Sequence, residues 1–277
     1  MTVTEYANAK INLFLDITGR REDGYHDIVS VMQSVSLCDT VTVTSRKSDK
    51  INITLICDDP SIPTDENNLI YKATLKYLTY FDICAEVKII LNKLIPIGAG
   101  LGGGSSDGAA TLRALNRIFG FATEAELMKI AAELGSDVPF CLIGGKALCT
   151  GRGEKLETIS DYPLFNLVIA IGKERISTPA AFRALDARYN NFADRAYSAV
   201  HCIGQPYNLF ESITDIPEIL KIKEIMTKSG AEYVLMSGSG PAVFGKFKNE
   251  EEARLAEIAL INEGFSAYNC HTVKGAL

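Results

Sequence analysis

The chain has 277 residues, of which 47% are hydrophobic, so it can form one large or two modest domains with a sizeable core. Its 28 basic and 34 acidic residues give a net charge of −6, which argues against a general nucleic-acid-binding surface. No apolar run approaches the roughly 18 residues that span a bilayer, and the first residues lack a signal-peptide pattern. We therefore expect a cytoplasmic protein with no nucleic-acid or membrane partner, in which any bound nucleotide is small.

The first half is predicted to be rich in strands. Residues 3–17 alternate, with Ile11 and Leu15 on one face and Lys10 and Asn12 on the other. A turn-rich loop follows at 19–24. The next predicted elements are strands near 28–36, 40–45 and 51–56, a helix over 67–80 and a strand over 87–91.

Two helices are predicted after a glycine-rich segment. The first begins near Ser106 and ends at Gly120. The second begins at Thr123, where Glu126 completes a capping-box pattern, and it ends before Gly135.

The second half alternates strands and helices. A buried strand is predicted over 167–171, helices near 178–187, 208–228 and 249–263, and strands near 232–236 and 242–247. This alternation predicts a second α+β domain that begins near residue 159. We therefore divide the chain into an N-terminal domain at 1–158 and a C-terminal domain at 159–277.

Residues 96–106 are the most informative segment. Five glycines in seven residues, Gly98, Gly100, Gly102, Gly103 and Gly104, let the backbone adopt positive φ and turn successive N–H groups toward an anion. The helix that follows adds its unpaired amides and the positive end of its dipole. The segment therefore predicts a phosphate site.

Two familiar phosphate loops fit this segment less well. Gly98, Gly100 and Gly103 match the dinucleotide pattern G-x-G-x-x-G, but Glu124 and Glu126, at the distance of its acidic residue, are on a predicted helix. The segment also lacks the lysine of a P-loop. A nicotinamide-dependent dehydrogenase is therefore kept only as an alternative.

Phosphoryl transfer also needs a group that accepts the substrate's hydroxyl proton and a cation near the transferred group. Asp137 and Lys10 fit these roles, since a lysine beside the base can stabilise a developing alkoxide. Both have structural interpretations too. Asp137 precedes Pro139 by two residues and can cap a helix, and Lys10 can be a solvated residue of a strand.

Three other features have both a binding and a structural interpretation. Tyr25 and His26 can offer a ring and an imidazole to a ligand, or fold onto their own surface. Phe182 is on a helix face where core packing is the default. Residues 237–240, Ser-Gly-Ser-Gly, can form a turn or an anion-binding nest.

No metal centre built by the protein is predicted. The seven cysteines form no C-x-x-C pair, and His26, His201 and His271 are far apart in the chain. We expect reduced, buried thiols and no zinc site.

Three segments together resemble the GHMP small-molecule kinases: 9–15, 96–107 and 235–244. The resemblance covers essentially the whole chain and implies an α+β fold, with an S5-like N-terminal domain and a ferredoxin-like C-terminal domain. It also implies that ATP, with Mg²⁺ carried by the nucleotide, binds at Pro96, Ile97, Gly98, Ala99, Gly100, Leu101, Gly102, Gly103, Gly104, Ser105 and Ser106.

Further segments resemble GHMP kinases whose substrates carry a cytidine diphosphate group. Residues 18–26 are similar to a cytidine-recognition loop, which implies that Tyr25 stacks on cytosine, that His26 hydrogen bonds to it and that Phe182 covers its other face. Residues 134–139 are similar to the segment that carries the catalytic aspartate. The resemblance thus implies that Asp137 is the general base and Lys10 its electrostatic partner, and that Asn12 and Thr178 also bind substrate.

The expected activity is ATP-dependent phosphorylation of a hydroxyl group in a cytidyl diphosphate sugar alcohol of the non-mevalonate isoprenoid pathway, by a monomer or a homodimer. Two alternatives remain besides the dehydrogenase. The same fold could act on another small alcohol, of the mevalonate or homoserine type, although the loop with Tyr25 and His26 argues against it. The chain could also be an idle nucleotide-binding module, which the presence of both Lys10 and Asp137 disfavours.

Overall fold

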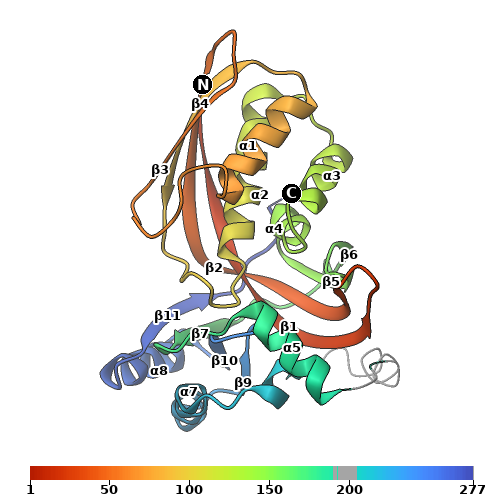
Figure 1. Ribbon diagram of the computed structural model, residues 1–277. Coiled ribbons are helices and arrows are strands. Elements are labelled where there is room, and N and C mark those ends of the chain that lie inside the picture. The colour runs from red at the N-terminus through yellow and green to blue at the C-terminus, as the bar shows by residue number, and fades with distance from the viewer. Residues whose placement is uncertain (190–191, 193–204, 277) are drawn as a thin grey trace.

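The computed structural model describes residues 1–189, 192 and 205–276. Figure 1 shows two parts, a sheet with helices against one face and a smaller sheet with its own helices. The predicted division after residue 158 falls in the connection between the two sheets. His201 and Cys202 lie outside the described residues.

The first part is built on a seven-stranded sheet in the order β3-β4-β2-β1-β8, with β5 and β6 continuing from β2. A long antiparallel hairpin of β1 and β2 forms its centre. The strands are β1 (Thr2–Arg20), β2 (His26–Lys47), β3 (Asn52–Cys57), β4 (Ala85–Asn92), β5 (Lys146–Gly151), β6 (Lys155–Thr158) and β8 (Tyr207–Asn208).

The prediction of two separate strands near 28–36 and 40–45 is wrong, because β2 is continuous. Asn8 of β1 pairs with Cys38 of β2, and Lys10 pairs with Ser34, so between these two pairs β2 contains more residues than β1. A bulge takes up the extra residues of β2 without ending the strand. The two ends of β2 pair with different strands. Residues 40–47 pair with β4, whereas residues 28–33 pair with β5.

Four helices of this part are α1 (Leu69–Tyr80), α2 (Gly103–Phe119), α3 (Glu124–Leu134) and α4 (Val138–Ile143). The predicted end of α2 is confirmed by Gly120, which has a φ of 73° at the C-cap, and the capping box of Thr123 and Glu126 is present. The helix α2 begins at Gly103, three residues before the predicted start, so the last glycines belong to its first turn. Among the described residues, no helix is both long enough and apolar enough to cross a membrane.

The second part has a four-stranded sheet in the order β11-β7-β10-β9, with every neighbouring pair antiparallel. Its sheet elements follow one another as β7, α7, β9, β10, α8 and β11, which is the ferredoxin-like β-α-β-β-α-β arrangement that we expected. The elements are β7 (Asn166–Ile171), α5 (Thr178–Arg188), the 3₁₀ helix η1 (Leu209–Ile213), α7 (Pro217–Lys228), β9 (Tyr233–Met236), β10 (Val243–Phe247), α8 (Glu250–Asn262) and β11 (Ser266–His271).

The single helix predicted over 208–228 is wrong in its first half. There the chain forms β8 and η1, and α7 begins only at Pro217. Proline disfavours helical backbone in the preceding residue, and Ile216 accordingly has an extended conformation with φ −104° and ψ 115°.

The chain after β11 returns to the first part, and Figure 1 shows the C-terminus beside α4. The amide of Val273 donates to the carbonyl of Ser34 at 3.0 Å, and the amide of Ala276 donates to Ile143 at 2.8 Å. The side chain of Gln33 donates to the carbonyl of Val273 at 2.9 Å. This tail therefore ties the second part back to the first.

A buried cluster of charges fixes the start of α2 against the sheet. Lys93, at the end of β4, donates to both Asp39 and Asp107. Asp39 also accepts from the amides of Leu94 and Ile95 at 2.6 and 2.8 Å. Asp107 Oδ1 is buried and has no hydrogen-bond partner in the described structure. Burial raises the pKa of Asp107 to about 7, against the lowering effect of Lys93.

This raised pKa predicts how stability depends on pH. Between the ordinary carboxyl value of 3.8 and about 7, the folded protein holds a proton on Asp107 that the unfolded chain releases. The contribution of Asp107 to the free energy of unfolding should therefore fall as pH rises through this window. In urea unfolding, we compare the free energy of unfolding of Asp107→Asn, which cannot ionise at this position, with that of the wild type. We expect the difference to shift in favour of the variant as pH rises from 5 to 8.

The matched control is Asp49→Asn, which removes a carboxylate from an exposed turn. Its stability difference from the wild type should not change in the same direction over this range. Parallel pH curves for Asp107→Asn and the wild type would show that Asp107 keeps its ordinary titration.

Candidate active site

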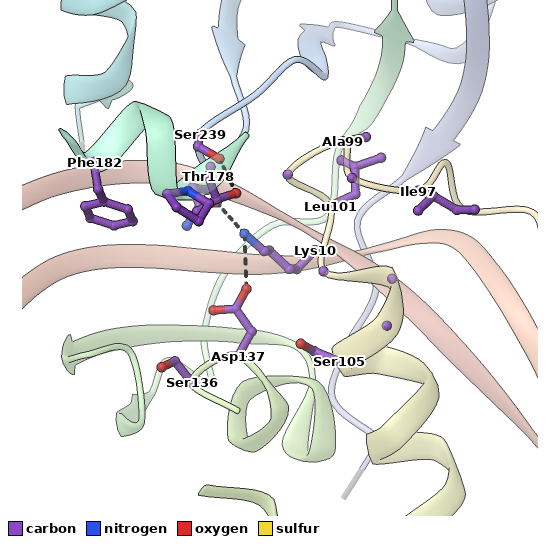
Figure 2. A pocket seen from close by; sticks show the side chains of 18 of the residues that line it. Lys10, Ile97, Ala99, Leu101, Ser105, Ser136, Asp137, Thr178, Phe182 and Ser239 are labelled. Atoms are coloured by element: carbon purple, nitrogen blue, oxygen red, sulfur yellow. Dashed lines mark hydrogen bonds and ion pairs between the residues drawn. The ribbon is translucent and has the colours of Figure 1, made fainter. Parts of the chain in front are cut away.

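A cavity of about 1060 Å³ lies between the two parts, and residues of both line it. The first part contributes β1, the start of β2, the glycine loop and the segment before α4, and the second contributes α5 and the loop after β9. Figure 2 shows the side chains of Lys10, Asp137, Thr178 and Phe182 around this space. Each predicted site residue except Ser106 is part of the lining.

The glycine loop has a backbone that side chains would not permit. Gly98, Gly100 and Gly102 have φ values of 65°, 80° and 69°. A Cβ on Gly100 would lie 2.2 Å from the carbonyl oxygen of Ser237, and one on Gly102 would lie 2.9 Å from Lys10 Cγ. The first N–H groups of α2, which have no partner within the helix, follow directly along the cavity wall. The loop thus has the N–H donors and the open space that a phosphate requires.

Ser106 is the one predicted ATP-binding residue that does not line the cavity. Its hydroxyl donates to the carbonyl of Asn8 at 2.6 Å, and its amide donates to the carbonyl of Gly102 at 2.9 Å. The residue is 1% exposed and joins α2 to β1. Because α2 begins at Gly103, the second serine points into the core, whereas Ser105 lines the cavity.

Lys10 and Asp137 lie together beside the glycine loop. Lys10 Nζ is 3.6 Å from Asp137 Oδ2, and it donates to Asn12 Oδ1 at 2.8 Å. Asn12 in turn donates to Ser30 Oγ at 2.8 Å, and Ser30 donates to the carbonyl of Phe14 at 2.7 Å. Lys10 is only 4% exposed, so the interpretation of a solvated lysine is excluded. This chain of hydrogen bonds holds the ammonium group toward Asp137.

The side chain of Asp137 does not act as a helix cap. Asp137 occupies the N-cap position of α4, with φ −87° and ψ −13°, but its carboxylate makes no capping hydrogen bond. The side chain is 30% exposed and faces Lys10 instead (Figure 2). The carboxylate therefore remains available to a hydroxyl group in the cavity.

His26 and Phe182 form a ring pair in the same cavity. Their ring centroids are 4.7 Å apart and their planes differ by 24°, which is a stacked arrangement. Phe182 comes from α5 and His26 from the first residue of β2, so the pair joins the two parts. His26 Nε2 also lies 2.8 Å from Asp186 Oδ1.

Tyr25 lies at the rim of the cavity and is 52% exposed. The guanidinium group of Arg152, from the turn between β5 and β6, lies 5.0 Å from the centroid of its ring. Tyr25 and Phe182 thus present aromatic rings to the same space from two different parts of the chain. A planar base could bind between such rings.

The segment 237–240 is a turn that contacts the glycine loop. The hydroxyl of Ser237 donates to the carbonyl of Gly100 at 3.0 Å, and the amide of Ala242 donates to that of Ala99 at 3.1 Å. Asn208 donates to the carbonyls of Met236 and Gly238 at 2.7 and 2.8 Å. The Ser239 and Thr178 hydroxyl groups lie 2.8 Å apart on the cavity wall.

A second part of the lining was not predicted from the sequence. It lies beside the glycine loop and includes Ser61, Pro63, Asn68, Leu69, Lys93 and Asp107. These residues come from the loop before α1 and its first residue, from the end of β4 and from α2. Only Asp107 had a sequence signal, its position next to the two serines. Arg20, Arg152, Arg183 and Asp186 also line the cavity without having been predicted.

Comparison with known proteins identifies the chain's relatives. The family described as GHMP kinases N terminal domain matches residues 68–145, and GHMP kinases C terminal matches residues 205–266. A 4-diphosphocytidyl-2-C-methyl-D-erythritol kinase of Exiguobacterium sibiricum is 43% identical over an alignment of 268 residues, and the match covers 92% of each chain.

Solved structures agree with this match. A crystal structure of 4-(cytidine 5'-diphospho)-2C-methyl-D-erythritol kinase is 34% identical, covers 99% of this chain and 100% of its own, and superposes with a TM-score of 0.81. A homoserine kinase from Cytophaga hutchinsonii has a TM-score of 0.68, with 99% and 95% of the chains covered, but at 21% identity it shows a common fold only. The chain therefore belongs to the GHMP kinase family, within its group of 4-diphosphocytidyl-2-C-methyl-D-erythritol kinases.

Proposed function

We propose that the protein transfers the γ-phosphoryl group of ATP to the 2-hydroxyl group of 4-diphosphocytidyl-2-C-methyl-D-erythritol. The observation that carries this proposal is that one cavity contains the Lys10–Asp137 pair, the glycine loop and the stacked rings of His26 and Phe182. The relatives named above support the choice of substrate.

Asp137 is the general base in this proposal. Its carboxylate accepts the proton of the substrate hydroxyl as the oxygen attacks the γ-phosphorus, and the bond to the β,γ-bridging oxygen breaks. Lys10, 3.6 Å from the carboxylate, offsets the negative charge that develops on the attacking oxygen. Because Asn12 holds the ammonium group at 2.8 Å, little reorganisation is needed as that charge appears.

The glycine loop and the first turn of α2 fit the ATP phosphates. The loop has positive φ at Gly98, Gly100 and Gly102, and the N-terminus of α2 favours negative charge. The neighbouring lining around Pro63, Asn68 and Leu69 would then hold the base and ribose of the nucleotide.

Mg²⁺ is expected to bind together with ATP and to neutralise phosphate charge. Ser105 is an oxygen-bearing side chain on the cavity wall, at the start of α2, that would contribute a ligand. Within the described ranges, no group of three or more histidine, cysteine or acidic side chains could hold a metal ion without the nucleotide.

In this proposal the cytidine moiety binds at the other end of the cavity. Phe182 stacks on His26, and Tyr25 stands at the rim, so a base bound here would have aromatic contacts and a hydrogen-bonding imidazole. A small alcohol of the mevalonate or homoserine type has no ring to use these contacts, and the comparisons do not favour this alternative.

Replacement of the proposed base tests the reaction directly. We expect Asp137→Asn to lower kcat by about 10²–10⁴-fold, because a carboxamide does not accept the hydroxyl proton. The KM for ATP should change little. ADP release with Mg-ATP and 4-diphosphocytidyl-2-C-methyl-D-erythritol measures kcat and the KM for ATP. The matched control is Asp49→Asn, which removes a carboxylate from an exposed turn. Near wild-type kcat in Asp137→Asn would refute the role of general base.

Removal of the ring at Phe182 tests the base site. Aromatic stacking on a base is worth about 1–3 kcal/mol, so Phe182→Ala should raise the KM for the cytidyl substrate by about 5- to 150-fold. The KM for ATP should stay within about twofold, since the glycine loop is not altered. Phe121→Ala is the control, because Phe121 is 60% exposed and does not line the cavity.

The same experiment includes competition by CMP. In the wild type, CMP should inhibit competitively against the cytidyl substrate, and Phe182→Ala should weaken this inhibition to a similar extent. Turnover of mevalonate or homoserine without any inhibition by CMP would instead favour the other small-alcohol kinases.

A further inference from the structure

The contact between His26 and Asp186 joins residues 160 positions apart, at the inner end of the proposed base site. His26 Nε2 lies 2.8 Å from Asp186 Oδ1. His26 is 7% exposed, and the side chain of Asp186 is 19% exposed. Asp186 follows Phe182 by one helical turn on α5, so the residue that stacks on the imidazole and the residue that bonds to it come from one helix face.

We propose that Asp186 is a positioning residue that sets the tautomer of His26 and thereby selects cytosine over uracil. The inference rests on the proposed function, since it concerns the base site of that substrate. An ionised carboxylate can only accept hydrogen bonds, so the Nε2 of His26 must carry the proton. In a neutral imidazole, Nδ1 is then left as an acceptor.

The surroundings favour this arrangement. Arg20 Nη2 lies 3.7 Å from the second oxygen of Asp186, so the carboxylate has a cationic neighbour besides the imidazole. Among the described hydrogen bonds, none engages Nδ1 of His26, and His26 lines the cavity. Since Asp186 occupies Nε2, Nδ1 is the ring nitrogen that is left for a ligand, and in this tautomer it accepts.

The stacking geometry determines how a base would meet this nitrogen. A base that hydrogen bonds to Nδ1 in the plane of the imidazole also lies nearly parallel to the ring of Phe182, since the two rings differ by only 24°. The exocyclic amino group of cytosine can donate to Nδ1. Uracil has a carbonyl oxygen at the corresponding position, so two acceptors would face each other and both would lose a hydrogen bond.

The tautomer is measured first, by ¹⁵N–¹H correlation spectra of the imidazoles in the full-length protein at pH 8. The chain has only three histidines, and the spectrum of His26→Gln assigns the signals of His26. We expect the Nε2–H tautomer in the wild type and a mixture of tautomers in Asp186→Ala. A protonated Nδ1 on His26 of the wild type, in either a neutral or a doubly protonated ring, would overturn the proposal.

Base selection is measured next, as the dissociation constants of CMP and UMP. The wild type should favour CMP by about tenfold or more, and Asp186→Ala should reduce this ratio at least several-fold. The KM for ATP should stay at its wild-type value. Asp186→Asn, which keeps an acceptor oxygen, should restore part of the ratio.

The control is Asp161→Ala, which removes an exposed carboxylate outside the cavity and should leave both dissociation constants unchanged. An unchanged CMP to UMP ratio in a folded Asp186→Ala variant would overturn the role of Asp186 alone, provided that the wild type turns over the cytidyl substrate. Failure of the wild type to bind CMP would overturn the proposed base site as well.

Discussion

The cavity depends on one contact, in which the glycine loop of the first part meets the turn at 237–241 of the second. The carbonyl of Gly100 accepts from the hydroxyl of Ser237 at 3.0 Å, and a Cβ on Gly100 would lie 2.2 Å from the carbonyl oxygen of Ser237. No side chain fits between the two backbones. The proposed phosphate site is therefore held at a fixed position relative to Thr178 and Phe182, which belong to the second part.

Buried charges hold α2, which carries the end of that loop, against the sheet. Lys93 bonds to Asp107 at the start of α2, and Arg113 in its middle donates to Glu5 at 3.1 Å and to the carbonyl of Tyr6 at 2.8 Å. A buried charge that lost its partner would be strongly destabilising, so these pairs specify one placement of the helix. Gly102, the N-cap of α2, thus lies against Lys10 of β1, where the proposed chemistry occurs.

Local patterns predicted the elements well wherever a feature depends on neighbouring residues. The capping box at Thr123 and the glycine end of α2 are set by backbone conformation within one turn, and both are as expected. The errors occur where long-range contacts decide. The continuous β2 depends on a bulge opposite β1, and Ser106 turns inward because α2 begins three residues early and packs on Asn8.

The sequence by itself determined the α+β class and the family, and it pointed to the residues that we propose for the reaction, because the glycine spacing and the motifs around Lys10 and Asp137 are local patterns. Only the tertiary structure decided that Asp137 faces Lys10 rather than capping α4, that Asn68 and Lys93 line the cavity, and that Asp186 meets His26. The physical reason is that these contacts join segments as much as 160 residues apart, and their distances depend on how the two sheets and their helices pack.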